Sequence, residues 1–460
     1  MDHLKIASEL TSFSYQAPVM SYESDGIEIF DNKDLFDDAD VRPRDIPGSK
    51  KEQYMPWGSD NKLPYEINRL VSEDEVTAQN KLFNTLTCYG AGLTFNDEET
   101  GKPSKNKDLK EWLRHQTLPA FFLNQCTDMK YYYFTVCVLI LNKSRTEINR
   151  IVHKEACYCR LAKADKNGNI PYIYYALWNK SNLEPADIER IPLLDINDPY
   201  GDLLVRTARV RNENGEFAEP SEFKFAVITR FPTVGCCYYP TPYWASIFRG
   251  GSYDDKKTIQ SGKRAKLRNG SSIKYQIEVE RGYYERICAE EKITDKEQMM
   301  ARIKKEKQSI QDYVMGIHNA GKSLITKYYI DPFGHEQRDV RINVIESKKE
   351  GGEWAEDEAA SINTMCFAEN NYPDLQGAVP GRHQNNTSGT DKREMFTIKQ
   401  SFEIAYHDIM LLPLNIVCWF NRWNVVPTVP MIQLTTLDEH KDSKKVNVSK
   451  TNKENNGDNH

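Results

Sequence analysis

The sequence predicts an α+β fold, with a mixed antiparallel sheet and helices in its first half and mostly helices in its second half. Three observations support this prediction. Runs of aromatic and β-branched residues between residues 131 and 231 alternate with turn-forming Asn-Gly pairs. A segment from Asp391 to Asn424 carries apolar residues at alternating steps of three and four. The 460 residues suffice for about three domains.

The composition excludes several classes of protein. Lys and Arg total 61 against 67 Asp and Glu, a net charge of −6, which argues against a uniformly basic protein but leaves a local basic patch open. The longest apolar run, Ile409 to Phe420, is too short to span a bilayer, and Met1 to Lys5 does not open a signal peptide. We expect the ten cysteines to be reduced thiols in a cytoplasmic protein, and neither they nor the nine histidines have metal-site spacing.

The first 50 residues form an acidic N-terminal arm. Between Glu23 and Asp45 there are nine carboxylates and three basic residues, so the arm is either solvated or a strap that docks on a neighbouring subunit. An ordered turn follows at residues 54–61. Two helices are then expected, at Tyr65–Val71 and Glu73–Cys88, and Gly90 ends the second one.

The middle of the chain predicts strands followed by alternating helices and strands. The expected strands are Tyr131–Leu141, Ile151–Lys163, Tyr172–Trp178, Leu203–Arg211 and Phe223–Phe231. Beyond them we expect a helix at Trp244–Leu267, a strand at Ser272–Glu280, a helix ending at Met315, a strand at Ser323–Ile330 and a helix at Glu353–Asn370. A capping box of Thr294 and Glu297 should open the helix that ends at Met315.

The last third predicts a loop and one long helix. Residues 373–391 are rich in Gly, Pro and Asn, and loops of this length are often functional. The helix from Asp391 to Asn424 should be kinked at Pro413. We expect one face of it to be buried, formed by Met395, Ile398, Phe402, Ala405, Ile409, Leu412, Ile416, Trp419 and Trp423. The last 24 residues are polar, typical of disorder.

The segment Gly316–Ser323 matches the spacing of a phosphate-binding P-loop, with Gly316, Gly321, Lys322 and Ser323 at the defining positions. A working P-loop has a strand before it and a helix after it. The expected order here is the reverse, a helix before and a strand after. We therefore interpret this segment as a decoy that does not bind nucleotide, with a P-loop NTPase as the alternative function.

Two further features are candidates for contact with a partner. Between residues 256 and 274 there are seven cations and no carboxylate: Lys256, Lys257, Lys263, Arg264, Lys266, Arg268 and Lys274. This stretch suits either a phosphate or acidic partner, or a subunit contact. Hydrogen-bonding side chains in the 373–391 loop suit sequence-blind contacts to a nucleic-acid backbone: Arg382, His383, Gln384, Asn385 and Asn386. The alternative is an ordinary surface loop. No catalytic motif is found, and we expect no enzyme and no cofactor.

The order of these features resembles the portal proteins of tailed bacteriophages and prophages of Bacteroides-type bacteria. Met55-Pro56-Trp57-Gly58-Ser59-Asp60-Asn61-Lys62-Leu63-Pro64-Tyr65 is similar to the opening of that family. Tyr238 to Trp244 resembles its aromatic, proline-containing lead into a helix, which here ends in Arg268-Asn269-Gly270. Asn371 to Gly377 and the helix containing Pro413 resemble the tunnel loop and the helix behind it.

The resemblance implies a portal-like subunit with named parts and adds Gln376 to the DNA-facing tunnel loop. Its parts would be an acidic arm (1–50), a mixed wing (51–240), a first stem helix (241–270), a small α/β clip (271–345), a second stem helix (346–372), the tunnel loop (373–391), a long kinked helix (392–424) and a short crown or disordered tail (425–460). The seven cations at 256–274 would then lie on the stem and clip.

The resemblance also implies a function. Such a protein forms a homo-oligomeric ring, usually of twelve subunits, at one capsid vertex of the virion, after assembly in the host cytoplasm. Double-stranded DNA passes through the ring without sequence recognition during packaging and ejection. The implied partners are the terminase large subunit, the head–tail adaptor and the major capsid or scaffold protein, with no membrane. A non-portal structural protein of a mobile element is a further alternative.

Overall fold

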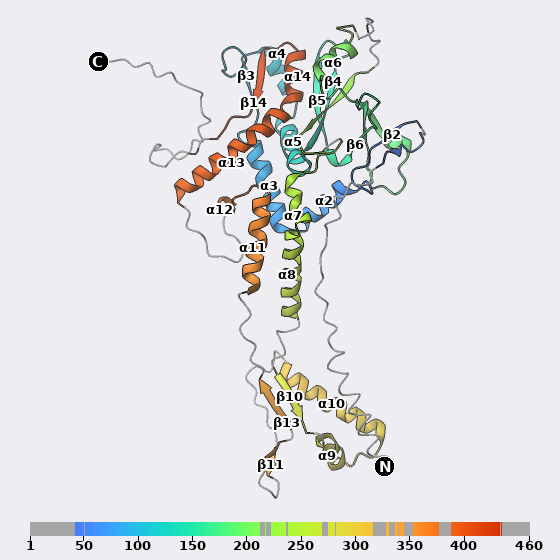
Figure 1. Cartoon of the computed structure of the whole chain (residues 1–460), viewed down its shortest axis with the longest axis vertical. Helices are drawn as coiled ribbons and strands as arrows, with labels where there is room; N and C mark the ends of the chain where they lie inside the picture. The colour runs from blue at the N-terminus through green and yellow to red at the C-terminus, as the bar shows by residue number, and fades with distance from the viewer. Residues whose placement is uncertain are drawn as a thin grey trace, which may run out of the picture. The chain divides into compact units, whose positions relative to one another are not determined.

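The computed structural model describes the chain in two compact units, joined within two helices (Figure 1). The described residues are 42–49, 51–211, 217, 222–235, 238–268, 275–280, 282–315, 328–330, 336–338, 340–344, 353–376, 388–432 and 434. The large unit comprises the described residues within 29–257 and 356–460, and the small unit those within 258–355. No helix in the described ranges is long and apolar enough to cross a bilayer.

The strands of the large unit form small antiparallel sheets. A three-stranded sheet has the order β5-β4-β9, from Ile148–Lys154, Phe134–Leu141 and Lys224–Arg230. A second has the order β6-β7-β8, from Cys159–Leu161, Tyr172–Tyr175 and Glu189–Pro192. Two-stranded sheets pair β1 (Arg44–Asp45) with β2 (Gln53–Tyr54), and β3 (Thr94–Asp97) with β14 (Val425–Thr428).

Helices surround these sheets. They are α2 (Leu63–Ser72), α3 (Glu75–Tyr89), α4 (Lys107–Arg114), α5 (Leu118–Tyr132), α6 (Pro199–Arg206), α7 (Ser246–Arg249), α8 (Ser252–Arg268), α11 (Glu353–Ala368), α12 (Pro373–Gln376), α13 (Gly389–Met410) and α14 (Leu412–Phe420). Short 3₁₀ turns lie at 156–158, 185–187 and 243–245. The helices α8 and α11 continue into the small unit.

The central strand β4 is buried on both faces. Phe134, Val136 and Val138 contribute to one apolar cluster, together with α2 and β6. Cys137 and Leu139 point the other way, into a second cluster with α5 and α14. Successive side chains of a strand point to opposite faces, so a strand buried on both sides must be apolar throughout, as β4 is.

The described strands of the small unit form two antiparallel pairs. β10 (Tyr275–Val279) pairs with β13 (Val340–Val344), and β11 (Tyr328–Ile330) pairs with β12 (Glu336–Arg338). Two helices, α9 (Tyr283–Glu290) and α10 (Lys296–Met315), follow β10. A Cβ atom at Gly262 of α8 would come within 2.6 Å of the Trp354 ring of α11, so only glycine permits this approach of the two helices.

The α+β prediction is confirmed, but several elements differ from those expected. The segment Leu203–Arg211 was expected as a strand, yet it begins inside helix α6. Asp198 accepts a hydrogen bond from the Gly201 N–H at 2.9 Å, and Pro199 occupies the first turn, so the local capping favours a helix. The helix expected at Trp244–Leu267 is interrupted at Gly251, which has a φ of 83°.

The ends of other strands and helices also differ from those expected. The strand expected from Tyr131 begins at Phe134, because α5 continues to Tyr132. The expected Ile151–Lys163 strand is divided into β5 and β6 by the 3₁₀ turn. The expected capping box of Thr294 is wrong, since the cap of α10 comes from Asp295, whose carboxylate accepts from the Gln298 N–H at 3.1 Å.

The long C-terminal helix is two helices followed by a strand. α13 ends at Met410 and α14 begins at Leu412, so the break lies where Pro413 lacks an N–H and its ring excludes a continuous helix. α14 ends at Phe420 rather than near Asn424, and the next residues form β14 against β3. The polar tail after Leu434 lies outside the described residues.

Candidate functional site

Two of the motifs on which the portal resemblance depends, residues 55–65 and 238–244, meet in the core of the large unit. The Trp57 ring stacks on the Tyr239 ring, with centroids 4.4 Å apart. The Tyr239 hydroxyl donates to the Met55 carbonyl at 2.9 Å and accepts from the Leu161 N–H at 2.7 Å. The fully buried Arg160 donates to the Asn61 backbone oxygen at 2.9 Å. These motifs therefore build the core rather than a site for ligand.

Only part of the predicted basic stretch, residues 256–274, contributes to the surface. Lys256 is fully buried, and its Nζ lies 2.5 Å from Asp74 Oδ1 and 2.9 Å from Glu75 Oε1, so it belongs to no basic surface. Lys257 donates to the Glu73 backbone oxygen, and Arg264 is exposed. Lys263 is half-buried, and Lys266 and Arg268 lie in α8. Lys274 lies outside the described residues.

The other predicted site residues lie mostly outside the described ranges. This holds for Arg382, His383, Gln384, Asn385 and Asn386 of the loop, and for the P-loop-like positions Gly316, Gly321, Lys322 and Ser323. Gln376 is described, at the end of α12. Its amide donates to Asn80 Oδ1 at 3.0 Å, so this side chain belongs to a network in the interior.

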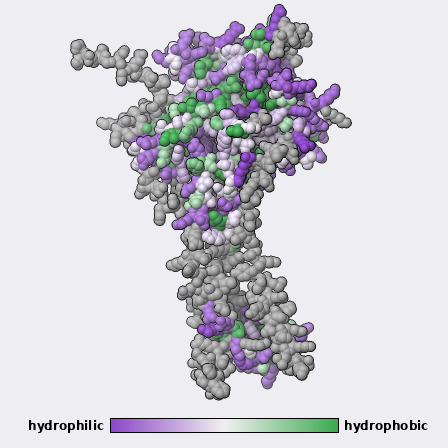
Figure 2. All heavy atoms as spheres, viewed as in Figure 1, coloured by the Kyte–Doolittle hydropathy of each residue, from purple (hydrophilic) through white to green (hydrophobic). Residues whose placement is uncertain are grey.

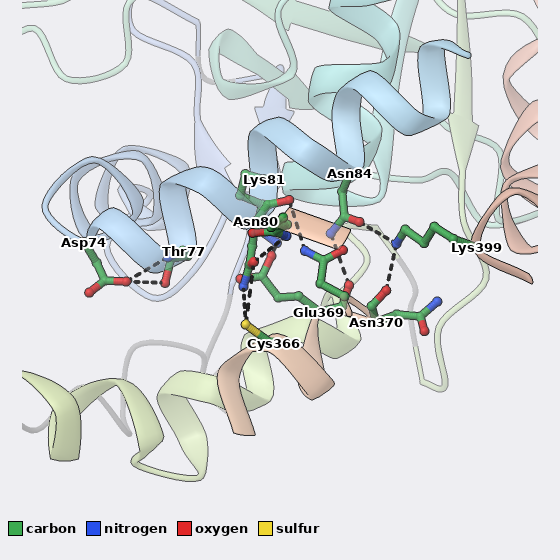
Figure 3. A network of polar contacts seen from close by, with 11 residues as sticks. Asp74, Thr77, Asn80, Lys81, Asn84, Cys366, Glu369, Asn370 and Lys399 are labelled. Carbon is green, nitrogen blue, oxygen red and sulfur yellow. Dashed lines mark hydrogen bonds and ion pairs between the residues drawn. The ribbon is translucent and has the colours of Figure 1, made fainter. Parts of the chain in front are cut away.

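That network is a set of buried charges between helices (Figure 3). Lys81 on α3 lies 2.9 Å from Glu369, just beyond the end of α11, and both side chains are essentially inaccessible to solvent. The Lys81 ammonium also lies 3.1 Å from the centroid of the Trp244 ring. An ammonium this deeply buried needs both partners to offset the loss of its hydration.

A second pair extends the network across α5 and α13. Lys130 lies 2.6 Å from Glu403 and 3.3 Å from the Tyr406 ring centroid. Lys399, one helical turn before Glu403, lies 3.9 Å from the same carboxylate. It also donates to Asn84 of α3 and, at 2.8 Å, to the Asn370 carbonyl. Three lysines thus share two carboxylates in the interior.

Amide side chains close the network. Asn84 donates to the Glu369 carbonyl at 3.1 Å, and Asn371 donates to the Asn80 carbonyl at 3.3 Å. Together with Gln376, they tie α3 to the end of α11, to α12 and to α13. The chain on both sides of residues 377–387 is therefore anchored to the same helix.

Burial shifts the protonation of this network. It lowers the pKa of Lys81 to about 7, although Glu369 opposes the shift, and Lys130 and Lys399 add to it. Burial likewise lowers the pKa of Lys399 to about 8, against the effect of Glu403. Burial also raises the pKa of Glu369. The charges are paired between buried helices, and Asn80 also contacts the Cys366 thiol, so the arrangement ties these helices together.

The network packs against the inner face of α13, and the outer face of this helix is apolar. We expected the opposite, an apolar face turned inward. On α13 the buried side chains include Lys399, Gln400 and Glu403. Ile398 and Phe402, predicted to be buried, are 47% and 48% exposed. Trp419 of α14, predicted to be buried too, is 45% exposed. Figure 2 shows hydrophobic residues at the surface of the viewed face, among hydrophilic ones. The expectation of a buried apolar face is thus wrong for α13 in the single chain.

A groove of about 340 Å³ lies between α3, α13 and the chain that follows β14. Gln400, Glu403 and His407 line it on the α13 side, and Val429 and Met431 on the opposite side. Gln400 spans it through hydrogen bonds of 2.8 Å to both the N–H and the carbonyl of Ile432. The groove is open, with polar and apolar walls.

Comparison with solved structures gives the class of fold. The structure is similar to a chain from the neck of an empty gene transfer agent (GTA) particle computed with C6 symmetry, with a TM-score of 0.50 and 11% identity over 85% of this chain and 87% of that chain. Chains from the virion of a native GTA particle and from its neck computed with C12 symmetry give TM-scores of 0.48, at 11% and 10% identity, covering 84% of this chain and 85% of theirs. No family model and no curated protein matches the sequence. At this identity the likeness shows the fold.

Proposed function

We propose that this chain is a portal subunit of a tailed-phage-like particle. Copies would form a ring at one capsid vertex, through which double-stranded DNA is packaged and ejected. The proposal combines the order of sequence motifs with a fold similar to that of a chain from the neck of a GTA particle. It implies a structural protein of the virion and not an enzyme.

The apolar outer face of α13 carries the proposal. Exposed apolar side chains at i and i+4, here Ile398 and Phe402, with Ala405 exposed on the same face, are costly in water unless another surface covers them. The inner face of the same helix is fixed by the charges of Lys399 and Glu403, so the helix cannot rotate to bury its apolar side. A second copy of the chain would cover this face in a ring.

The remaining parts of the proposal concern partners. The ring would dock the terminase large subunit on one side and a head–tail adaptor on the other, and would contact the capsid or scaffold protein. The loop residues 382–386 would contact DNA weakly and without sequence preference, which allows DNA to slide. Gln376, whose amide is bonded to Asn80, would anchor the start of this loop.

The first test is the mass of the purified protein, by light scattering and negative-stain microscopy. Twelve copies of 53.2 kDa give about 638 kDa, with a central hole. The variant I398D/F402D should retain its fold by circular dichroism but lose the ring, because buried carboxylates without partners oppose association. A matched variant, I398L/F402L, keeps the face apolar and should keep the ring.

Two results would contradict the proposal. A wild-type chain that stays monomeric, both alone and with capsid or scaffold protein, is not a portal subunit. Rings that form equally well from I398D/F402D would show that the outer face of α13 is not the contact between subunits.

A further inference from the structure

Three arginines from distant parts of the sequence meet at one end of the large unit. Arg145 lies in the turn between β4 and β5, Arg209 follows α6, and Arg422 follows α14. The Arg209 guanidinium donates to the carbonyl of Thr146, next to Arg145. Figure 1 places α6, α14 and the β4–β5 strands at the same end of this unit. We call these three residues the arginine cluster.

Side-chain hydrogen bonds hold the segments of the cluster together. Asn421, immediately before Arg422, accepts from the Ile148 N–H at 2.8 Å and donates to the Ile148 carbonyl at 3.0 Å. The end of α14 is therefore fixed to the first residue of β5, beyond the turn that holds Arg145. The position of the cluster is a property of the fold and not of one mobile turn.

The arginine cluster carries unpaired positive charge in the part of the chain that the structure describes. Among the residues that the structure describes, none of the three arginines forms an ion pair with a carboxylate, whereas arginines elsewhere in the unit do, for example Arg69 with Glu66. Arg145 donates to the Glu222 backbone oxygen at 3.3 Å. Burial, and then the positive charge of Arg422, lower the pKa of Arg209. Arg422 is exposed, Arg145 and Arg209 are half-buried, and within the described ranges no carboxylate pairs with any of them.

Aromatic rings hold two of these arginines in place. The Arg209 guanidinium carbon lies 3.7 Å from the centroid of the Phe420 ring, and that of Arg145 lies 4.2 Å from the Phe223 ring. A guanidinium stacked on a ring has its N–H donors in the plane parallel to the ring, where they can reach an anion. The exposed Trp419 ring lies on the same helix end, packed against Tyr200 at 5.0 Å.

The backbone at these positions would favour glycine. Arg145 and Arg422 have φ angles of 55° and 59°, and Ala208, next to Arg209, has 56°. Arg422 occupies the position after α14 where helices commonly end in glycine, as the Trp423 N–H to Cys418 carbonyl bond of 3.0 Å shows. Non-glycine residues at such angles are strained, so glycine can replace these two arginines without a backbone cost.

We propose that the arginine cluster binds the phosphates of a DNA backbone. The planar guanidinium donates two parallel hydrogen bonds to a phosphate, and an exposed ring beside a cation, as Phe223 lies beside Arg145, suits nucleic-acid binding without sequence preference. All the residues come from one chain and lie outside the 373–391 loop. The inference therefore goes beyond the proposed passage of DNA through the ring and does not depend on ring formation.

The test uses the variant R145G/R422G of the full-length chain. Glycine relieves the backbone strain at both positions, so the variant should melt no lower than wild type. Binding to a duplex of about 30 base pairs is measured by fluorescence anisotropy between about 50 and about 200 mM salt. Losing two phosphate contacts should weaken binding roughly ten- to hundredfold at about 0.1 M salt and reduce the slope of log K against log salt by about 2.

The matched control is K292G. Lys292 is also a cation in the left-handed region, with a φ of 55°, but it lies in the small unit. This control should bind DNA like wild type. An equal loss of affinity in K292G, or an unchanged affinity and slope in R145G/R422G, would overturn the proposal. Tighter competition by polyglutamate than by DNA of equal charge would also overturn it and assign the cluster to an acidic protein.

The mass of R145G/R422G separates this inference from the proposed ring. Rings that form normally but bind DNA weakly support the arginine cluster and leave the ring proposal intact. Wild-type protein that forms no rings but binds DNA through these arginines contradicts only the ring.

Discussion

Lys81 shows how one buried residue makes stability depend on pH. Its pKa is about 7 in the folded chain, well below the value near 10.4 of an unfolded lysine. Between these values the unfolded chain binds more protons, so stability increases as the pH rises from 7. The raised pKa of Glu369 acts in the opposite direction, because the folded chain then holds this proton more tightly than the unfolded chain. Lys399, with a pKa of about 8, adds to the rise.

We therefore expect the Tm of the wild-type protein to rise by about 4 °C between pH 7 and 9 because of the Lys81–Glu369 pair. The measurement is the Tm of wild type and of K81M/E369L, which removes both charges together. The double variant should have a flatter profile, since the remaining contribution comes from Lys399. Parallel profiles for the two proteins would show that Lys81 titrates as an exposed lysine does.

Single residues of this network could not be recognised in the sequence. Asn80, Lys81 and Asn84 read as ordinary polar positions of the predicted helix 73–88, whose existence is confirmed. Their partners, Glu369 and Lys399, are about 290 and 315 positions away along the chain. Only the packing of α3 against α13 and the end of α11 turns these surface-type residues into an interior network. Gln376 was singled out by resemblance for a contact with DNA, and it instead donates to Asn80.

At the scale of elements, the Gly and Pro positions predicted where helices end, whereas the apolar period of α13 did not predict which of its faces is buried. Gly90 ends α3 and Pro413 separates α13 from α14, as expected. The apolar period of α13 predicted a buried face, but the buried side is the charged one. Periodicity identifies a face that avoids water and does not say whether the same chain or another copy covers it.

The start of α3 gives a prediction about the contribution of a buried ion pair. Asp74 caps the helix through its Oδ2, which accepts from the Thr77 N–H at 2.8 Å, and its Oδ1 lies 2.5 Å from Lys256 of α8. Asn caps a helix about as well as Asp, so D74N removes the charge pair and keeps the cap. We expect D74N to lower the free energy of unfolding by about 3 kcal/mol, because buried Lys256 loses its buried partner and keeps only the exposed carboxylate of Glu75.

Urea denaturation of D74N and two further variants measures this effect. D74N/K256M should recover much of the loss, since it removes the buried lysine charge and the Glu75 carboxylate is exposed to water. D187N removes the exposed pair with Lys180, 2.6 Å apart, and should change stability much less, because exposed pairs contribute little. Equal losses in D74N and D187N would show that burial of the Lys256 pair does not matter to the fold.

At the scale of the whole molecule, eight residues distinguish the two candidate functions, a P-loop NTPase and a portal ring. The sequence from Gly316 to Ser323 has P-loop spacing, and these positions lie outside the described residues. The elements around them are consistent with a helix before and a strand after, since α10 ends at Met315 and β11 spans Tyr328–Ile330. A P-loop works in the opposite order, with its phosphate site at the start of a helix.

The variant K322A decides between the two functions. A P-loop NTPase would bind MgATP in the wild type and lose this binding in K322A, because the lysine contacts the β- and γ-phosphates. For a portal ring we expect titration calorimetry to detect no binding of MgATP to either protein. Light scattering should give the same mass for both, near 638 kDa for twelve copies of 53.2 kDa. ATP binding that depends on Lys322 would contradict the decoy interpretation, whatever the mass of the protein. Identical rings without ATP binding would support the interpretation of the eight residues as a connection between a helix and a strand.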